Sequence, residues 1–390
     1  MNQDQDRSPL ADLLRERIAR EGPLSFSEVM AAALYDPRYG YYTNLLGFGA
    51  HGDFITSPET HPLFGLLIGR QALDVWQALA RPRPFRILEL GGGSGALAES
   101  LIRLVRSEVP DLAYTIEERS PSLKRVQRGR LAGLGVGWSA ARQPAHVILA
   151  NEVLDAQPVH RVVVRDGRLH ELRVGIDPAG AFMWVESDGV PPAVAEYFDR
   201  LGLLPPEGGV AEVNVGLVDW VQWLAERLER GLALVLDYGY PAEELFRRPQ
   251  GSLLTYYRHS LGTDPLVRLG QQDISAHVDF TTLASAAHAA GLRVLGVTSQ
   301  RALLRNLGLD QLQARMRSPT DRQALASLVD ARGLGRIGAL FLGRGLPDDY
   351  VPAGLAGGQP WPEPAALPVL PEEVADADFL DQWREAFPTS

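Results

Sequence analysis

The chain has 390 residues, of which 45% are hydrophobic and 22% charged, with a formal net charge of −10 and no cysteine. These values are ordinary for a globular protein, and the acidic balance argues against a nucleic-acid-binding protein, which usually carries a basic surface. The absence of cysteine excludes a disulfide framework, a thiolate nucleophile and a cysteine-ligated metal.

The N-terminus mixes acidic residues with amides and lacks the basic start and apolar core of a secretory signal. Its acidic residues also argue against a mitochondrial transit peptide. The apolar runs fall short of the ~20 residues that a membrane-spanning helix needs. We therefore expect a cytoplasmic protein with no membrane span.

Residues 1–84 are predicted to form an N-terminal helical segment. Apolar residues repeat at helical spacing from Leu10 to Ile18, and Ser25 and Glu28 have the spacing of a capping box before the next helix. Helices therefore precede the first strand of the predicted sheet.

A polar segment within this region runs into a helix N-terminus, and its candidate binding residues are Asp53, Thr56, Ser57, Pro58 and Glu59. Free N–H groups and a partial positive charge at a helix N-terminus suit an anion, such as the carboxylate of a bound amino-acid moiety. A simple helix cap is the alternative, and the segment alone favours it.

The sequence RILELGGGSG at residues 86–95 is the most informative motif. A short apolar strand, with Glu89 near its end, leads into Gly91, Gly93 and Gly95, and a helical pattern follows. This order is typical of a nucleotide-binding βαβ unit. The spacing fits the dinucleotide loop of a nicotinamide oxidoreductase and the S-adenosylmethionine loop of a methyltransferase, and a turn without a ligand is the third interpretation.

Two further predicted strands, at residues 114–118 and 146–154, alternate with helices and indicate a parallel sheet. Glu118 ends the first of these strands. Its separation from the glycines along the sequence is the one expected for a ribose-binding acid. Glu117 is the alternative if the register is shifted by one residue.

Polar residues also end the strand at 146–154. Asn151 and Glu152 terminate it, and Asp155 follows three residues later. Side chains at the carboxyl ends of parallel strands point into the crevice where ligands bind, whereas the alternative is ordinary turn formation.

The second half of the chain is less regular. Asp166-Gly167 between alternating runs predicts a hairpin, and residues 242–280 are expected to form a long polar loop. Asp273, His277 and Asp279 in that loop could form a metal site or an acid–base pair, but hydrogen bonds that hold the loop are more usual, and we expect no metal.

The predicted domain division is an N-terminal helical cap at 1–84, a core at 85–158 and 231–344, a β/helical insertion at 159–230, and a proline-rich arm and tail at 345–390.

Seven segments together resemble the MidA family of S-adenosylmethionine-dependent methyltransferases, which includes a mitochondrial assembly factor that methylates an arginine on a respiratory complex I subunit. The resemblance covers roughly residues 21–344. The segments, in the order seen in that family, are GPLSFSEVMAAALYDPRYGYY, GDFITSPE, ILELGGGSGAL, IEERSPSLKRVQ, ILANEVLDAQPV, LVLDYGYP and QQDISAHVDFT. The family loop usually reads G-P-G-x-G, so Gly91-Gly92-Gly93-Ser94-Gly95 departs from it while leaving the backbone contacts plausible.

The resemblance implies an α/β fold with a class I methyltransferase Rossmann-like sheet, parallel except for one antiparallel strand, and S-adenosylmethionine as the cofactor. It places the glycines at the methionine portion, Glu118 at the ribose and Trp138 near the adenine. The full set of expected cofactor-binding residues is Asp53, Thr56, Ser57, Pro58, Glu59, Glu89, Gly91, Gly93, Gly95, Glu118, Ser120, Trp138 and Asn151.

The expected reaction is N-methylation of an arginine in a partner protein. A guanidinium is a cation that carboxylates must grip, and Glu152 and Asp155 are the expected catalytic residues. A small-molecule N- or O-methyltransferase and an S-adenosylmethionine-binding assembly factor without catalysis are the alternatives, and a nicotinamide oxidoreductase is a further one. The expected partner is a protein, for which the resemblance suggests a complex I subunit, and a homodimer is also considered.

Overall fold

The computed structural model describes residues 8–44, 56–138, 144–258 and 260–356. Asp53 and the tail from residue 357 therefore lie outside the described residues. The chain forms two compact units, which are described separately. Unit 1 comprises Met1–Leu45, Leu154–Asp219 and Tyr238–Ser285, and unit 2 comprises Leu46–Val153, Trp220–Asp237 and Ala286–Ser390. The predicted segments 1–84 and 159–230 are each shared between both units, and the four-part division stays a prediction.

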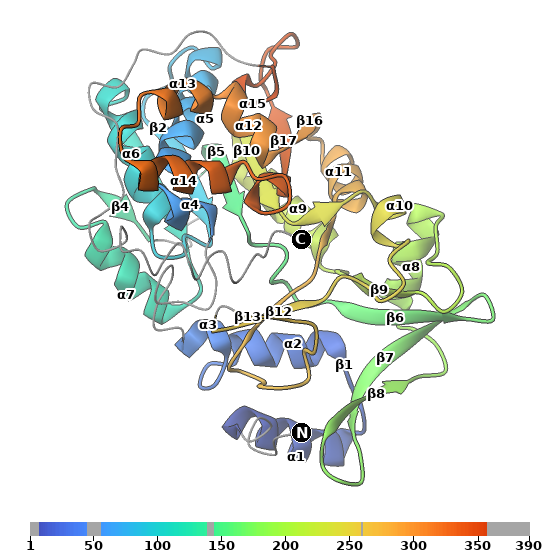
Figure 1. The fold of residues 1–390 in the computed structure, drawn as a ribbon. Helices are drawn as coiled ribbons and strands as arrows, with labels where there is room; N and C mark the ends of the chain where they lie inside the picture. The colour runs from blue at the N-terminus through green and yellow to red at the C-terminus, as the bar shows by residue number, and fades with distance from the viewer. Residues whose placement is uncertain (1–7, 45–55, 139–143, 259, 357–390) are drawn as a thin grey trace. The chain divides into compact units, whose positions relative to one another are not determined.

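Unit 2 is built on a seven-stranded sheet with the order β16-β17-β10-β5-β2-β3-β4 (Figure 1). Strand β17 is the last in sequence and pairs antiparallel with both β10 and β16, while the pairs from β10 to β4 are parallel. This confirms the predicted class I sheet. The strands are β2 (Phe85–Leu90), β3 (Leu112–Glu117), β4 (Val136–Gly137), β5 (Ala145–Asn151), β10 (Leu228–Asp237), β16 (Arg293–Ser299) and β17 (Gly338–Arg344).

Apolar sequence explains the centre of this sheet. Strands β2 and β5 are buried along almost their whole length, as expected for parallel strands with helices on both faces. Helix α5 packs on α6 and β5, and α6 also contacts β3. The helices of this unit are α4 (Ser57–Thr60), α5 (Leu63–Ala78), α6 (Ala96–Glu108), α7 (Pro121–Arg130), α12 (Gln300–Asn306), α13 (Leu309–Ala314), α14 (Pro319–Leu328) and α15 (Ala353–Ala356).

Unit 1 contains a five-stranded antiparallel sheet with the order β1-β7-β6-β9, to which β8 is added through β7. The predicted hairpin is present: Asp166 and Gly167 join β6 to β7 with φ values of 51° and 69°, as a two-residue turn with both residues at positive φ requires. The strands are β1 (Leu24–Ser25), β6 (His160–Arg165), β7 (Arg168–Ile176), β8 (Phe182–Glu186) and β9 (Val210–Val213).

Helices complete unit 1. The capping box predicted at Ser25 and Glu28 is formed at the start of α2. The helices within this unit are α1 (Pro9–Glu21), α2 (Phe26–Tyr35), α3 (Tyr41–Asn44), α8 (Pro192–Leu201) and α10 (Ala242–Leu245), and the chain passes between units within α9 (Leu217–Arg227) and α11 (Phe280–Ala289).

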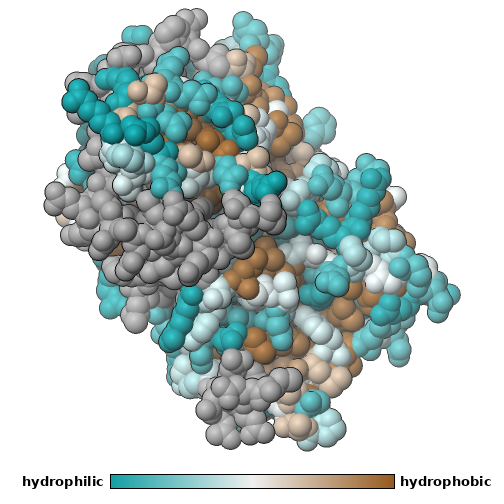
Figure 2. Space-filling model, in the orientation of Figure 1, coloured by the Kyte–Doolittle hydropathy of each residue, from teal (hydrophilic) through white to brown (hydrophobic). Residues whose placement is uncertain are grey.

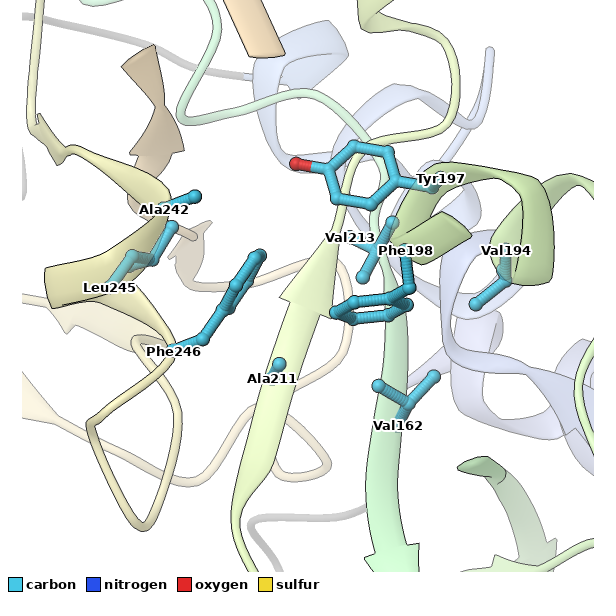
Figure 3. Packing of buried hydrophobic residues seen from close by; sticks show 9 residues of the cluster. All are labelled: Val162, Val194, Tyr197, Phe198, Ala211, Val213, Ala242, Leu245 and Phe246. Carbon is cyan, nitrogen blue, oxygen red and sulfur yellow. The ribbon is translucent and has the colours of Figure 1, made fainter. Parts of the chain in front are cut away.

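An apolar cluster joins β6 and β9 to α8 and α10 (Figure 3). The ring centroids of Phe198 and Phe246 lie 5.3 Å apart, and the hydroxyl of Tyr197 donates a hydrogen bond of 2.6 Å to Asp279. The cluster consists of Val162, Val194, Tyr197, Phe198, Ala211, Val213, Ala242, Leu245 and Phe246.

The prediction of one long loop over residues 242–280 is wrong. The region holds α10 and several short strands, three of which form their own sheet in the order β13-β12-β14. Strands of two to four residues are too short to show a periodic pattern, so they could not be predicted from the sequence. The strands of this region and its approach are β11 (Gly239–Tyr240), β12 (Leu254–Tyr257), β13 (Ser260–Gly262), β14 (Asp273–Ser275) and β15 (Val278–Asp279).

The described surface is mixed in polarity. On the face drawn in Figure 2, apolar patches alternate with hydrophilic residues. None of the described helices combines the length and the apolar character needed to cross a membrane.

Candidate active site

The glycine loop of unit 2 connects β2 to α6. Gly91, Gly93 and Gly95 all have positive φ, at 63°, 52° and 89°. The N–H of Gly91 donates to the carbonyl oxygen of Glu117 over 2.9 Å, which fixes the loop against the end of β3. A Cβ atom at Gly93 would meet none of the described atoms within 4 Å. The main chain at Gly93 therefore faces open space among the described residues, where a ligand can lie against the backbone.

Glu118 follows β3 directly and is partly buried. One carboxylate oxygen accepts the N–H of Ser120 over 2.9 Å, and the other accepts Nε2 of Gln127 over 3.1 Å. Burial raises the pKa of the Glu118 carboxyl. The alternative residue, Glu117, has its carboxylate 3.9 Å from Nε of Arg227. The Glu118 side chain is linked to the glycine loop through Gln127, which also bonds to Gly93.

Gln127 is a residue that the sequence analysis missed. Its side chain is fully buried on α7, and Nε2 donates to the carbonyl oxygen of Gly93 over 2.9 Å as well as to Glu118. Its Oε1 accepts Nε1 of Trp138 over 2.9 Å. A glutamine on the buried side of a polar helix was the available signal, and it is weak. Gly93, Glu118 and Trp138, which are three of the predicted cofactor-binding residues, are thus all hydrogen-bonded to the side-chain amide of Gln127.

Ser120 has a structural use of its own. Its hydroxyl accepts the N–H of Leu123 over 3.2 Å and so caps α7, which begins at Pro121. The cap aligns the helix that carries Gln127, so Ser120 contributes to the site at least through α7.

Glu89 lies inside the sheet at the end of β2 and is 3% exposed. Its carboxylate accepts the hydroxyl of Tyr114 over 2.7 Å. Burial raises the pKa of Glu89 to about 7, against the hydrogen bond from Tyr114, which lowers it, and the charge of Glu118 raises it further. The two carboxylates are therefore close enough to influence each other.

The α4 segment is bound to the glycine loop. Ser94, within the loop, donates its hydroxyl to Glu59, and Arg130 donates to Ser94 and lies 3.4 Å from Glu59. Thr56 occupies the N-cap position of α4 without a capping hydrogen bond from its side chain, and Pro58 lies in the first turn.

Ser57 is buried and links this segment to two other elements. Its hydroxyl donates to Oε1 of Gln300 over 2.8 Å, and its N–H donates to Oε1 of Glu152 over 3.4 Å. The predicted anion-binding segment is therefore attached to the end of β5 as well as to the glycine loop.

Asn151 ends β5, and Glu152 follows it directly. Nδ2 of Asn151 donates to Oε1 of Glu152 over 3.1 Å, whereas its Oδ1 is buried without a hydrogen-bond partner in the described part of the chain. Glu152 has a φ of 53°, which is rare for a residue with a side chain and costs of order 1–3 kcal/mol. A strained acid beside a buried, unsatisfied acceptor is typical of a functional position.

Asp155 belongs to unit 1, where its charge acts on the hydroxyl of Tyr42. Tyr42 donates its hydroxyl to Asp273 over 2.8 Å and stacks on Tyr35 with ring centroids 5.6 Å apart. Burial raises the pKa of Tyr42, and the charges of Asp273 and Asp155 raise it further. Both aspartates are buried. Tyr35, Tyr42, Asp155 and Asp273 are called the tyrosine–carboxylate cluster below.

Asp273 and Asp279, which were predicted to act together with His277, have different hydrogen-bond partners. Asp273 bonds to Tyr42, while Asp279 accepts the N–H groups of Thr281 and Thr282 at the start of α11. The described residues contain no group of three or more potential ligands arranged for a metal ion.

The residues of unit 2 fit an S-adenosylmethionine site. The main chain is open at Gly93, an acid follows the next strand, and an indole is hydrogen-bonded into the same network. With the sheet order, these features define a class I methyltransferase fold. A model of the family described as "Putative S-adenosyl-L-methionine-dependent methyltransferase" matches residues 67–298. The chain belongs to this family, which confirms the resemblance, and it is an S-adenosylmethionine-dependent methyltransferase.

Individual relatives agree with this assignment. The Drosophila melanogaster protein named "Protein arginine methyltransferase NDUFAF7 homolog, mitochondrial" is 31% identical over 72% of this chain and 70% of its own length. The Danio rerio protein named "Protein arginine methyltransferase NDUFAF7, mitochondrial" is 30% identical over 81% and 80%. A crystal structure from Burkholderia thailandensis, bound to S-adenosyl-homocysteine, shares 33% identity with a TM-score of 0.81 and covers 90% of this chain and 95% of its own.

The same relatives correct one prediction. The acidic N-terminus led us to expect a cytoplasmic protein, whereas the curated relatives from fly, zebrafish and human are all named as mitochondrial. The cytoplasmic location is therefore wrong as a prediction. The composition of a few terminal residues is a weak guide to location.

Proposed function

We propose that this methyltransferase transfers a methyl group to an arginine of a partner protein. The curated relatives carry the name protein arginine methyltransferase, which supports a protein substrate. The observation that carries the proposal is the tyrosine–carboxylate cluster, in which Asp155 and Asp273 are buried around Tyr42. Buried acids and aromatic rings are the groups that recognise a guanidinium cation.

In this proposal the cofactor lies against unit 2. Gly91 and Gly93 offer main-chain contacts, Glu118 accepts the ribose hydroxyls, and Trp138 lies near the adenine. The unsatisfied Oδ1 of Asn151 suits a hydrogen-bond donor of the cofactor. When bound, S-adenosylmethionine supplies an electrophilic methyl group on a sulfonium.

Glu152 and Asp155 are the proposed catalytic residues. A guanidinium stays protonated at any pH near neutrality, so it must be oriented by anions and must lose a proton when its nitrogen gains a methyl group. Asp155 orients the guanidinium, and Glu152, held by the amide of Asn151 and the N–H of Ser57, accepts the proton. The nitrogen–carbon bond forms as the sulfur–carbon bond breaks, which leaves S-adenosyl-homocysteine, methylarginine and one proton.

The proposed partner is a protein that supplies the arginine. The resemblance to the MidA family suggests a subunit of respiratory complex I, and a homodimer stays a prediction from the sequence alone.

The test is methyl transfer from labelled S-adenosylmethionine to proteins of a cell extract, followed by mass spectrometry of the labelled peptides. We expect the label on arginine side chains. Label confined to small molecules would contradict the proposal in favour of a small-molecule methyltransferase. Binding of S-adenosyl-homocysteine without any transferred label would indicate an assembly factor instead.

A further inference from the structure

One buried amide connects the parts of unit 2 that are expected to bind the cofactor. Gln127 is the central residue, because its Nε2 donates to Gly93 and Glu118 while its Oε1 accepts from Trp138. The orientation of this amide is determined by its partners. A carbonyl oxygen and a carboxylate both require N–H donors, and an indole N–H requires an acceptor.

We propose that Gln127 is a positioning residue that sets the orientation of the Glu118 carboxylate and the Gly93 carbonyl for the cofactor and links both to Trp138. The inference rests on the proposed placement of the cofactor. Its physical basis is preorganisation: Glu118 is held on one oxygen by the N–H of Ser120 and on the other by Gln127. A carboxylate fixed in this way loses little freedom when it accepts two hydroxyls.

The chemistry of the site leaves few substitutes for glutamine. A glutamate would provide no N–H donors when ionised, and it would place a second negative charge beside Glu118. A methionine fills a similar volume but leaves Gly93, Glu118 and Trp138 without their shared partner. Because Gln127 is fully buried, water cannot freely replace these hydrogen bonds.

The experiment measures the Kd of S-adenosyl-homocysteine by calorimetry for the full chain and for Gln127→Glu and Gln127→Met. We expect Gln127→Met to weaken binding about tenfold and Gln127→Glu at least about thirtyfold at pH 8. Gln77, on an exposed position of α5, gives the matched controls Gln77→Glu and Gln77→Met, which should bind like the unaltered chain.

The pH dependence separates positioning from a merely structural role. The carboxyl introduced by Gln127→Glu lies in a buried, acidic environment that raises its pKa, so it gains a proton and a donor as the pH falls. Binding by this variant should recover between pH 8 and pH 6, whereas Gln127→Met should not recover. A structural defect would lower the melting temperature and weaken binding equally at each pH.

The outcomes are distinguishable. If the unaltered chain binds no S-adenosyl-homocysteine, the proposed cofactor site is wrong. If the unaltered chain binds it and both Gln127 variants bind equally well, the site stands and the role of Gln127 is overturned. If Gln127→Glu fails to fold, Gln127→Met decides by its Kd.

Discussion

The two candidate binding regions differ in how the chain assembles them. In unit 2, Gln127 bonds to Gly93 and Glu118, which lie 34 and 9 positions away. In unit 1, the hydrogen bond between Tyr42 and Asp273 joins residues 231 positions apart. The hydrogen bonds among Gly93, Gln127 and Glu118 thus come from neighbouring motifs, whereas the tyrosine–carboxylate cluster depends on the folding of distant segments. The difference suggests that cofactor binding and acceptor binding can be altered separately.

The largest expected effect is the loss of methyl transfer when Asp155 in unit 1 is replaced, and it tests whether acceptor binding can be altered without cofactor binding. Asp155→Asn removes a charge that would orient the guanidinium, and we expect kcat/KM for the protein acceptor to fall about 1000-fold, which corresponds to ~4 kcal/mol. The Kd of S-adenosyl-homocysteine should change less than about twofold, because the cofactor-binding residues belong to unit 2.

Asp177→Asn is the matched control, since the Asp177 carboxylate accepts the N–H groups of Ala179 and Ala181 in the turn between β7 and β8. Unchanged transfer by Asp155→Asn would rule out its catalytic role. Equal losses of transfer and of cofactor binding would show that the two regions are not separable.

A second prediction concerns the close carboxylates of unit 2. The pKa of Glu89 in the folded chain is about 7, above its ordinary value of 4.5, so the folded state binds this proton more tightly than the unfolded state. The folded state therefore loses stability as the pH rises through this interval. Glu89→Gln removes this pH dependence of the free energy of unfolding. Above pH 7 the variant should be more stable than the unaltered chain by up to about 3 kcal/mol, and below about pH 4.5 the two should differ little.

Urea denaturation at several pH values measures this difference. Glu108→Gln, at an exposed position of α6, is the control. If Glu89→Gln raises the free energy of unfolding by the same amount at every pH, the ionisation of Glu89 is not the cause.

The smallest expected effect separates backbone strain from ligand contact at the glycine loop. Gly93 and Gly133 both have positive φ, 52° and 79°, and a Cβ atom at either meets no described atom within 4 Å. Alanine should therefore cost similar folding free energy at both positions, of order 1 kcal/mol. We expect Gly93→Ala alone to weaken binding of S-adenosyl-homocysteine, by about thirtyfold. Similar Kd values for the two variants would mean that no ligand lies against Gly93.

The sequence predicts unit 2 better than unit 1 for a physical reason. A buried strand, a glycine turn and an amphipathic helix are all local patterns, so the β2–α6 unit and the acid after β3 could be recognised directly. The antiparallel last strand followed from the family resemblance. Gln127 escaped because its three bonds depend on the packing of α7, which one glutamine in a polar helix does not reveal.

The tyrosine–carboxylate cluster could be predicted only in part. The sequence singled out Asp155 from its place after a strand and Asp273 as part of a different polar group. That these two residues belong to one cluster with Tyr35 and Tyr42 is a result of tertiary structure. The short strands β12 and β14 were likewise hidden, because their pairing rather than their own sequence makes them strands.

We propose that the main chain at Gly93 and the acid Glu118 together hold the sulfonium nucleoside. A crystal structure of this chain with S-adenosyl-homocysteine is the decisive measurement. We expect ligand density against residues 91–95, with both ribose hydroxyls within hydrogen-bond distance of Glu118. Ligand density elsewhere, or a ribose bound without Glu118, would show that this placement of the cofactor is wrong.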